Sequence, residues 1–297
     1  MTFNEGVRGD PSRVRTSGGR RGMAIGGGLG GGGLLLVLVV MLLTGQNPVG
    51  LLGGGDGTGQ DAAPGLDLRN CQTGADANAR TECRMVLTAD ALDVYWDGAM
   101  AEQAGGSYVM PGFTIFTDAV DTGCGAATSA VGPFYCPADS SVYLDIGFFD
   151  QLETQLGAQN APLAQMYIVA HEWGHHTQHL LGTMSSADTR DTGPTGDAVR
   201  LELQADCFAG MFIGAAATTV DPDTGETFLQ EPTADQVRTA LDAAAAVGDD
   251  RIQQSAGREV EPHTWTHGSA EQRTRWFTTG YGEGTLQACD TFAVGTP

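Results

Sequence analysis

Two histidines and a glutamate near the middle of the chain have the spacing of a metal-dependent hydrolase. His171 and His175 are four residues apart, and Glu172 follows the first of them, within VAHEWGHHTQHLLG. On a helix, residues four apart stand one turn above each other, so both imidazoles can converge on one Zn²⁺. Glu172 would then lie beside the ion, where a general base for a metal-activated water is needed. The pattern His-Glu-x-x-His therefore predicts a zinc site that hydrolyses peptide bonds.

Residues 163–181 can form the helix that this spacing requires. Met166, Tyr167, Ala170 and Gly174 follow one another at intervals of three or four, which gives the stripe that a helix buries. The alternative is a buried helix in which the histidines are incidental.

The third zinc ligand must come from outside this helix. A catalytic zinc ion needs three protein ligands and one open position. His176 points about 140° away from His171, and His179 lies about 12 Å farther along the helix axis, so neither can join His171 and His175 at one ion.

A second predicted helix, at 197–212, offers the missing ligand. Glu202 and Asp206 are four residues apart on it, beside an apolar stripe. A carboxylate in such a helix is costly to bury unless it is paired or binds a metal. We interpret Glu202 as the third ligand and Asp206 as the acceptor that orients a ligating histidine through its other ring nitrogen. The alternative is two solvated carboxylates.

A histidine near the C-terminal end is a candidate for the catalytic machinery. His267 precedes a predicted helix whose start is marked by Ser269 and Gln272, a capping box. Its imidazole could donate a hydrogen bond to the oxyanion that forms during hydrolysis, and Arg273 could pair with carboxylates of the site. The alternative for both residues is local capping and surface pairing.

The first 66 residues differ in composition from the rest. Residues 1–22 are polar and basic, which predicts a disordered cytoplasmic tail. Residues 23–43 carry no charge and have about the length that spans a bilayer, so we expect a single transmembrane anchor. The positive-inside rule then places the N-terminus in the cytoplasm and the remainder outside. Residues 44–66 are predicted to form a flexible Gly-rich linker. The alternative to an anchor is a cleaved signal peptide with residues 34–43 as its apolar core.

Residues 67–297 are predicted to form one catalytic domain that does not bind nucleic acid. The chain of 297 residues has a net charge of −21. Because the phosphate backbone of a nucleic acid would repel so acidic a protein, we expect no nucleic-acid partner. Its six cysteines, in a domain predicted to be exported, favour disulfides over buried free thiols, the alternative. Because two of the pairs would close short loops, we predict Cys71–Cys83, Cys124–Cys136 and Cys207–Cys289.

The remaining patterns indicate an α+β domain that is mainly helical and has a small antiparallel or mixed sheet. The expected elements are a helix at 88–104, strands at 108–111, 113–117 and 141–146, a loop at 121–137, and helices at 148–156, from 231 onward and after 269. This order suits a zincin, in which an edge strand beside the metal receives an extended substrate by strand addition.

Several stretches closely resemble the bacterial family of putative neutral zinc metallopeptidases. They are CQTGADANARTEC, TGCGAATSAVGPFYCPADSSVYLDIGFF, VAHEWGHHTQHLLG, RLELQADCFAG and THGSAEQRTRWFTTGY, and the resemblance covers nearly all of residues 67–292. His171, Glu172 and His175 match the family's zinc and catalytic motif, and Glu202 matches its downstream glutamate. The Glu-x-x-x-Asp element is also similar to that of membrane-linked gluzincin proteases. The resemblance implies a zincin fold and peptidase activity on a peptide or protein substrate.

Together these patterns predict a membrane-anchored, zinc-dependent peptidase that acts outside the cytoplasmic membrane. One alternative is a catalytically silent envelope scaffold that zinc stabilises and that binds a partner. Another is a disulfide-stapled binding domain without metal.

Overall fold

The structure, a computed structural model, describes residues 2–17 and 66–297. The expected anchor at 23–43 and nearly all of the expected linker at 44–66 lie outside the described residues. Within residues 2–17 and 66–297, no helix combines the length and the apolar character needed to cross a bilayer.

The described residues form an α+β fold with a small sheet. In chain order, the elements are η1 (Pro11–Arg13), β1 (Arg15–Ser17), α3 (Gly74–Ala79), α4 (Thr81–Ala99), η2 (Met100–Ala104), β2 (Gly112–Phe116), β3 (Ala119–Thr122), β4 (Gly125–Thr128), η3 (Ser129–Val131), β5 (Phe134–Cys136), β6 (Ser141–Asp145), α5 (Phe148–Leu156), α6 (Pro162–Leu181), α7 (Thr183–Ser186), α8 (Asp197–Ala215), α9 (Ala234–Ala246), α10 (Asp249–Ser255), η4 (Pro262–Thr264) and α11 (Ala270–Glu283).

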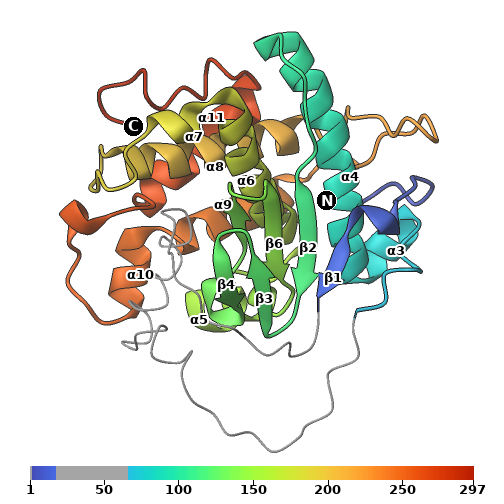
Figure 1. Cartoon of the computed structure of the whole chain (residues 1–297), viewed down its shortest axis with the longest axis horizontal. Helices are drawn as coiled ribbons and strands as arrows, with labels where there is room; N and C mark the ends of the chain where they lie inside the picture. The colour runs from blue at the N-terminus through green and yellow to red at the C-terminus, as the bar shows by residue number, and fades with distance from the viewer. Residues whose placement is uncertain (1, 18–65) are drawn as a thin grey trace, which may run out of the picture.

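The main sheet is mixed and has the order β1-β2-β6-β5. β1 and β6 both run parallel to β2, whereas β5 runs antiparallel to β6 and forms an edge of the sheet. β3 and β4 form a separate antiparallel pair. α6 lies against β5 and β6, α8 packs on α6, and α11 packs on α8 (Figure 1). The prediction of an α+β fold with a small mixed sheet is confirmed.

Two glycines explain how closely the helices that carry the motifs approach one another. A Cβ at Gly174 of α6 would lie 3.0 Å from backbone atoms of Ala205 in α8. A Cβ at Gly280 of α11 would lie 1.8 Å from the carbonyl oxygen of Cys207, also in α8. Both helices can pack on α8 at this distance because these positions have no side chain, and this packing brings the two halves of the site together.

Residues 2–17 are part of the folded domain. Phe3 and Val7 are fully buried, and β1 extends the sheet beside β2. The guanidinium of Arg13 donates to Asp93 at 2.5 Å and lies 5.7 Å from the ring centre of Trp173. The prediction of a disordered tail is therefore wrong for these residues. The composition of this segment could not reveal the fold, because the buried carboxylate that compensates the charge of Arg13 belongs to Asp93, far along the chain.

Three local predictions need correction. α4 begins at Thr81 rather than at 88, directly after α3. The expected strand at 108–111 is irregular, and Pro111 within it has no N–H to donate to a sheet. The expected loop at 121–137 contains β4 and β5; β4 pairs with β3 directly before it, and β5 pairs with β6, which follows the expected loop.

All six cysteines form disulfides, in the predicted pairs Cys71–Cys83, Cys124–Cys136 and Cys207–Cys289. The third bridge joins α8 to the segment after α11, so it ties the C-terminal end to the helix that carries Glu202. The alternative of buried free thiols is wrong.

Candidate metal centre

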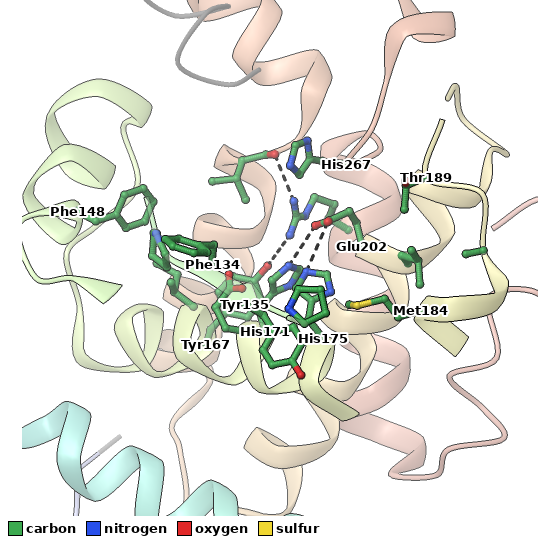
Figure 2. A pocket seen from close by; sticks show the side chains of 18 of the residues that line it. Phe134, Tyr135, Phe148, Tyr167, His171, His175, Met184, Thr189, Glu202 and His267 are labelled. Atoms are coloured by element: carbon green, nitrogen blue, oxygen red, sulfur yellow. Dashed lines mark hydrogen bonds and ion pairs between the residues drawn. The ribbon is translucent and has the colours of Figure 1, made fainter. Parts of the chain in front are cut away.

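α6 and α8 bring three metal-ligating side chains to one point. His171, His175 and Glu202 each offer a ligand atom, and these atoms lie within 4.8 Å of one another. The Nε2 atom of His171 is 3.2 Å from Oε2 of Glu202, and Nε2 of His175 is 3.5 Å from Oε1. Figure 2 shows the two imidazoles side by side with the carboxylate above them. The structure thus brings together the three residues that the sequence assigned to zinc.

Both imidazoles are held so that the same nitrogen faces this point. Nδ1 of His171 is 2.9 Å from Oδ1 of Asp206, and Nδ1 of His175 is 2.9 Å from Oε1 of Gln178. The amide nitrogen of Gln178 donates to the carbonyl oxygen of Leu201 at 2.7 Å, which fixes its oxygen toward the histidine. With Nδ1–H donating to these acceptors, each Nε2 presents its lone pair to the site.

This donor set fits a divalent cation. Two nitrogen lone pairs and a carboxylate aimed at one point repel each other unless protons or a metal ion lie between them. Burial acts to lower the pKa of His171, but the carboxylates of Asp206 and Glu202 outweigh it and raise the pKa to about 10. Burial likewise opposes the ionised form of Glu202, yet the charges of His175 and His267 hold its pKa well below the usual range. The cluster is therefore stabilised by positive charge between its three side chains. Two imidazoles with one carboxylate are a ligand set that zinc prefers.

Glu172 lies beside the candidate ligands on α6. It is 7% exposed and lines the same cavity. Burial raises its pKa above the usual 4.5, against the opposing charges of His175 and His171. A carboxylate whose pKa is raised is a stronger proton acceptor than an ordinary glutamate.

Asp206 is the centre of a buried charge network behind His171. It is fully buried, and besides the imidazole it accepts hydrogen bonds from Nε and Nη2 of Arg273, both at 2.9 Å, and from the hydroxyl of Tyr167 at 2.5 Å. Burial opposes its charge, but Arg273 and His171 keep its pKa below the usual value. The sequence predicted the contact of Asp206 with a ligating histidine. The alternative of surface pairing is wrong for Arg273, which is 2% exposed. Sequence reasoning missed Tyr167, which it placed in the core stripe.

His267 lines the cavity on the other side of Glu202 (Figure 2). Its Nδ1 is 3.3 Å from Oδ1 of Asp249, while Oδ2 of the same aspartate accepts the backbone N–H groups of Thr266, His267 and Gly268 at 2.7 to 3.0 Å. Burial disfavours the charged imidazole, but Glu202 and Asp249 raise its pKa. Sequence reasoning missed Asp249, and its position after Gly248 at the start of a short helix was the available signal.

His176 points away from the metal ligands, as its helical position predicted. Its Nδ1 lies 3.1 Å from the hydroxyl of Tyr135, and its Nε2 lies 2.6 Å from the carbonyl oxygen of Val109. It therefore anchors the irregular segment before β2 to α6.

The metal ligands open into a cavity of about 320 Å³. Its walls come from β5, α5, α6, α7 and α8, so the edge strand β5 lies beside the candidate ligands. β6, at the expected strand 141–146, is an inner strand of the sheet, with β2 on one side and β5 on the other. The site therefore combines candidate ligands for a cation, a buried proton acceptor, a third histidine, His267, and room for a substrate.

Comparison with known proteins agrees with this geometry. The family model described as "Putative neutral zinc metallopeptidase" matches residues 5–292. The uncharacterized proteins Rv2575 of Mycobacterium tuberculosis and Mb2605 of Mycobacterium bovis are each 48% identical to the chain over 295 residues, which is 99% of both sequences. The uncharacterized protein YpfJ of Escherichia coli is 37% identical over 240 residues, 79% of this chain and 78% of its own length.

No solved structure matches the chain significantly. The family match includes residues 5–17 of the N-terminal segment as well as every residue of the candidate centre, from His171 to Arg273. The chain belongs to the family of putative neutral zinc metallopeptidases.

Proposed function

We propose that the protein is a zinc-dependent peptidase with a zincin-like arrangement of its site. The observation that carries the proposal is the convergence of His171, His175 and Glu202 within 4.8 Å, with Glu172 in the same cavity. His171 Nε2, His175 Nε2 and the carboxylate of Glu202 would hold the ion. When bound, zinc supplies polarisation of the substrate carbonyl and lowers the pKa of water toward about 7.

The chain's own residues supply the proton transfers and the positioning. Glu172 takes a proton from the attacking water and returns it to the amine that leaves. The imidazole of His267 donates a hydrogen bond to the oxygen on which charge develops. Asp206 holds the ring of His171, and Arg273 keeps Asp206 ionised. The edge strand β5 can pair with an extended peptide that crosses the site.

Replacement of the proposed base tests this function. The Glu172→Gln variant should bind one zinc ion per chain, as the wild type does, and lose cleavage of a peptide library by about 100-fold or more. Glu271→Gln, an exposed glutamate on α11, is the matched control and should keep full activity. Undiminished turnover by Glu172→Gln would remove the proposed role of this residue.

Replacement of the proposed third ligand tests the metal site separately. Glu202→Ala should lower the zinc content measured by metal analysis, because two imidazoles alone hold the ion weakly. An unchanged zinc stoichiometry would exclude Glu202 as a ligand. Normal zinc content together with a blank peptide library would favour the alternative function, a zinc-stabilised envelope scaffold.

We also propose that the catalytic domain acts outside the cytoplasmic membrane. Three disulfides support this location, because such bonds persist in oxidising compartments. The pairing of β1 with β2 requires residues 2–17 to lie on the same side of the membrane as the domain. The expected cytoplasmic N-terminus conflicts with that pairing, and so does a single membrane crossing at 23–43, so the proposal places residues 2–17 and the domain together outside.

Thiol labelling in intact cells tests this location. Ser12→Cys and Thr154→Cys place single free thiols at exposed positions of the N-terminal segment and of α5. A membrane-impermeant maleimide should label both variants, and the wild type serves as the unlabelled control. Labelling at 154 without labelling at 12 would show that the N-terminal segment lies across the membrane from the domain, and no labelling at either would contradict the extracytoplasmic location.

A further inference from the structure

The cavity beside the metal ligands has a markedly apolar wall. Away from the ligands, its lining is made of side chains that cannot form ion pairs, among them Phe134, Phe148, Leu156, Ile168, Met184 and Leu201. Figure 2 shows Phe134 and Phe148 on one side of the histidine pair and Met184 on the other. A substrate that passes over the metal ligands therefore has apolar side chains on both flanks.

The charged groups of the lining lie at the candidate metal centre. Among the described residues that line the cavity, the carboxylates are Glu172 and Glu202, and the guanidinium is that of Arg273. Arg273 binds Asp206 through two hydrogen bonds. A carboxylate on a substrate side chain would meet the two glutamates, and an ammonium group on the aromatic side would find no carboxylate beside Phe134 and Phe148. On the aromatic side, both kinds of charge would lose hydration without gaining a partner.

The two aromatic residues of this wall differ in how firmly they are held. Phe134 is 6% exposed and stacks on Tyr143 with ring centres 5.1 Å apart, so it forms a fixed surface. Phe148 is the first residue of α5 and remains partly exposed, with its neighbour Phe149 buried in the core. Leu156, the last residue of α5, is also partly exposed and lines the same cavity. α5 therefore presents two accessible apolar side chains to whatever enters.

The volume accommodates a large side chain. A cavity of about 150 Å³ lined by apolar residues takes up benzene, and this cavity measures about 320 Å³. It has room for an aromatic or leucine-sized side chain together with part of the peptide backbone.

We propose that the cavity selects peptides with a large, neutral, apolar side chain next to the bond that is cut, and that Phe148 and Leu156 set this preference. The inference rests on the proposed zinc-peptidase function, because the metal ligands define where the scissile bond lies. It adds the chemical class of side chain that the protein recognises.

Hydroxamates test the preference without any cleavage step, because their head group binds zinc directly. The probes are the hydroxamates of N-acetyl-phenylalanine, leucine, alanine, aspartate and lysine, titrated by calorimetry into the zinc-loaded full chain. The phenylalanine and leucine compounds should bind about tenfold or more tightly than the alanine compound, in line with the discrimination of apolar pockets. The aspartate and lysine compounds should bind no more tightly than alanine. Equal affinities across the series, or tightest binding of a charged compound, would overturn the proposal.

A charge placed in the wall should change the preference. Phe148→Asp puts a carboxylate at the first position of α5, where the helix N-terminus favours negative charge, so the fold should tolerate it. Its affinity for the phenylalanine compound should fall about tenfold and its affinity for the lysine compound should rise. The matched control, Gln155→Glu, adds the same charge at an exposed position of the same helix and should leave the series unchanged. An unaltered series in Phe148→Asp would remove this residue from the pocket.

The outcomes separate this inference from the function on which it rests. Cleavage of the peptide library without regard to apolar residues, together with a flat hydroxamate series, would leave the peptidase standing and refute the selective pocket. A graded hydroxamate series with no cleavage of any peptide would keep the pocket's preference and refute the peptidase. A chain that takes up no zinc would refute both.

Discussion

Two histidine–aspartate pairs line the site, and they are built in different ways. His171 is held by Asp206, whose other donors are the guanidinium of Arg273 and the hydroxyl of Tyr167. His267 is held by Asp249, whose second oxygen accepts three backbone N–H groups from residues 266–268. One carboxylate is compensated by a buried guanidinium, and the other by the imidazole of His267 together with amide groups of a loop.

The difference predicts different consequences of losing each carboxylate. Without Asp206, the charge of Arg273 would remain buried and unpaired, which is among the most expensive single defects in a protein. Without Asp249, neutral N–H groups would lose their acceptor, which costs less. The pair of His171 and Asp206 therefore holds α6, α8 and α11 together around the candidate metal centre. The pair of His267 and Asp249 positions one loop and the imidazole of His267 beside the cavity.

The largest expected effect is that of Asp206→Ala. We expect a loss of about 3–5 kcal/mol in the free energy of unfolding, because Arg273 loses its partner, and a fall of about 10–100-fold in zinc affinity, because His171 loses the group that orients it. Urea unfolding of the zinc-free protein and zinc titration measure the two effects. Asp242→Ala, at an exposed position of α9, is the control. A loss no greater than that of the control would show that the two pairs do not differ as described.

The next effect in size is that of His267→Ala on catalysis. Loss of one donor to the oxyanion should lower kcat by about 100–1000-fold, while zinc content and the unfolding midpoint stay close to the wild type. Steady-state kinetics on a cleaved peptide, with metal analysis of the same sample, measures this. A loss of zinc in parallel with activity would instead make His267 part of the metal site.

Asp249→Asn should have a smaller effect than either change. An amide oxygen can still accept some of the three N–H groups, so we expect a loss of about 1–3 kcal/mol in the free energy of unfolding. Activity should fall because the imidazole of His267 is less well positioned, while zinc content is kept. Urea unfolding and kinetics on the same preparation test this. A destabilisation as large as that of Asp206→Ala would contradict the comparison.

The smallest effect concerns acid stability of the zinc-free protein. Burial opposes the charge of Asp249, but hydrogen bonds from His267, its charge and the backbone N–H groups hold the pKa below the usual 3.8. A lowered folded pKa contributes stability that is present above pH 3.8 and is lost as the pH falls through the folded value. Urea midpoints measured from about pH 5 downward should therefore fall less steeply in Asp249→Asn than in the wild type. Parallel curves would show that this carboxylate is not stabilised in the fold.

The sequence was most informative where the physics is local. Residues four apart on a helix must share a side, so the pairing of His171 with His175 followed from their spacing. The capping box Ser269–Gln272 is present as predicted, and Thr233–Gln236 forms a second one, because each box is closed within a single turn. The three disulfide pairs were also predicted correctly, although spacing alone supports only the two that close short loops.

The sequence failed where partners are distant and chemically ordinary. Asp249 was overlooked because its partners are backbone amides 17 to 19 residues away, which any residue type could supply. Residues 2–17 were assigned to a disordered tail, since nothing in their composition indicates that Asp93 and the edge of β2 will receive them. The apolar wall of the cavity joins β5, α5 and α7, whose side chains read individually as core residues.

The candidate zinc motif could be predicted from the sequence, because His171, Glu172 and His175 occupy one helix and the fixed pitch of that helix relates them. The sequence also determined which residues can cap, cross-link or ionise. Only the tertiary structure decided how α8 docks on α6 at Gly174, and therefore where Glu202 meets the histidines and which aspartate holds each imidazole. That docking depends on packing between segments far apart in the chain, and the spacing of residues within one helix does not specify it.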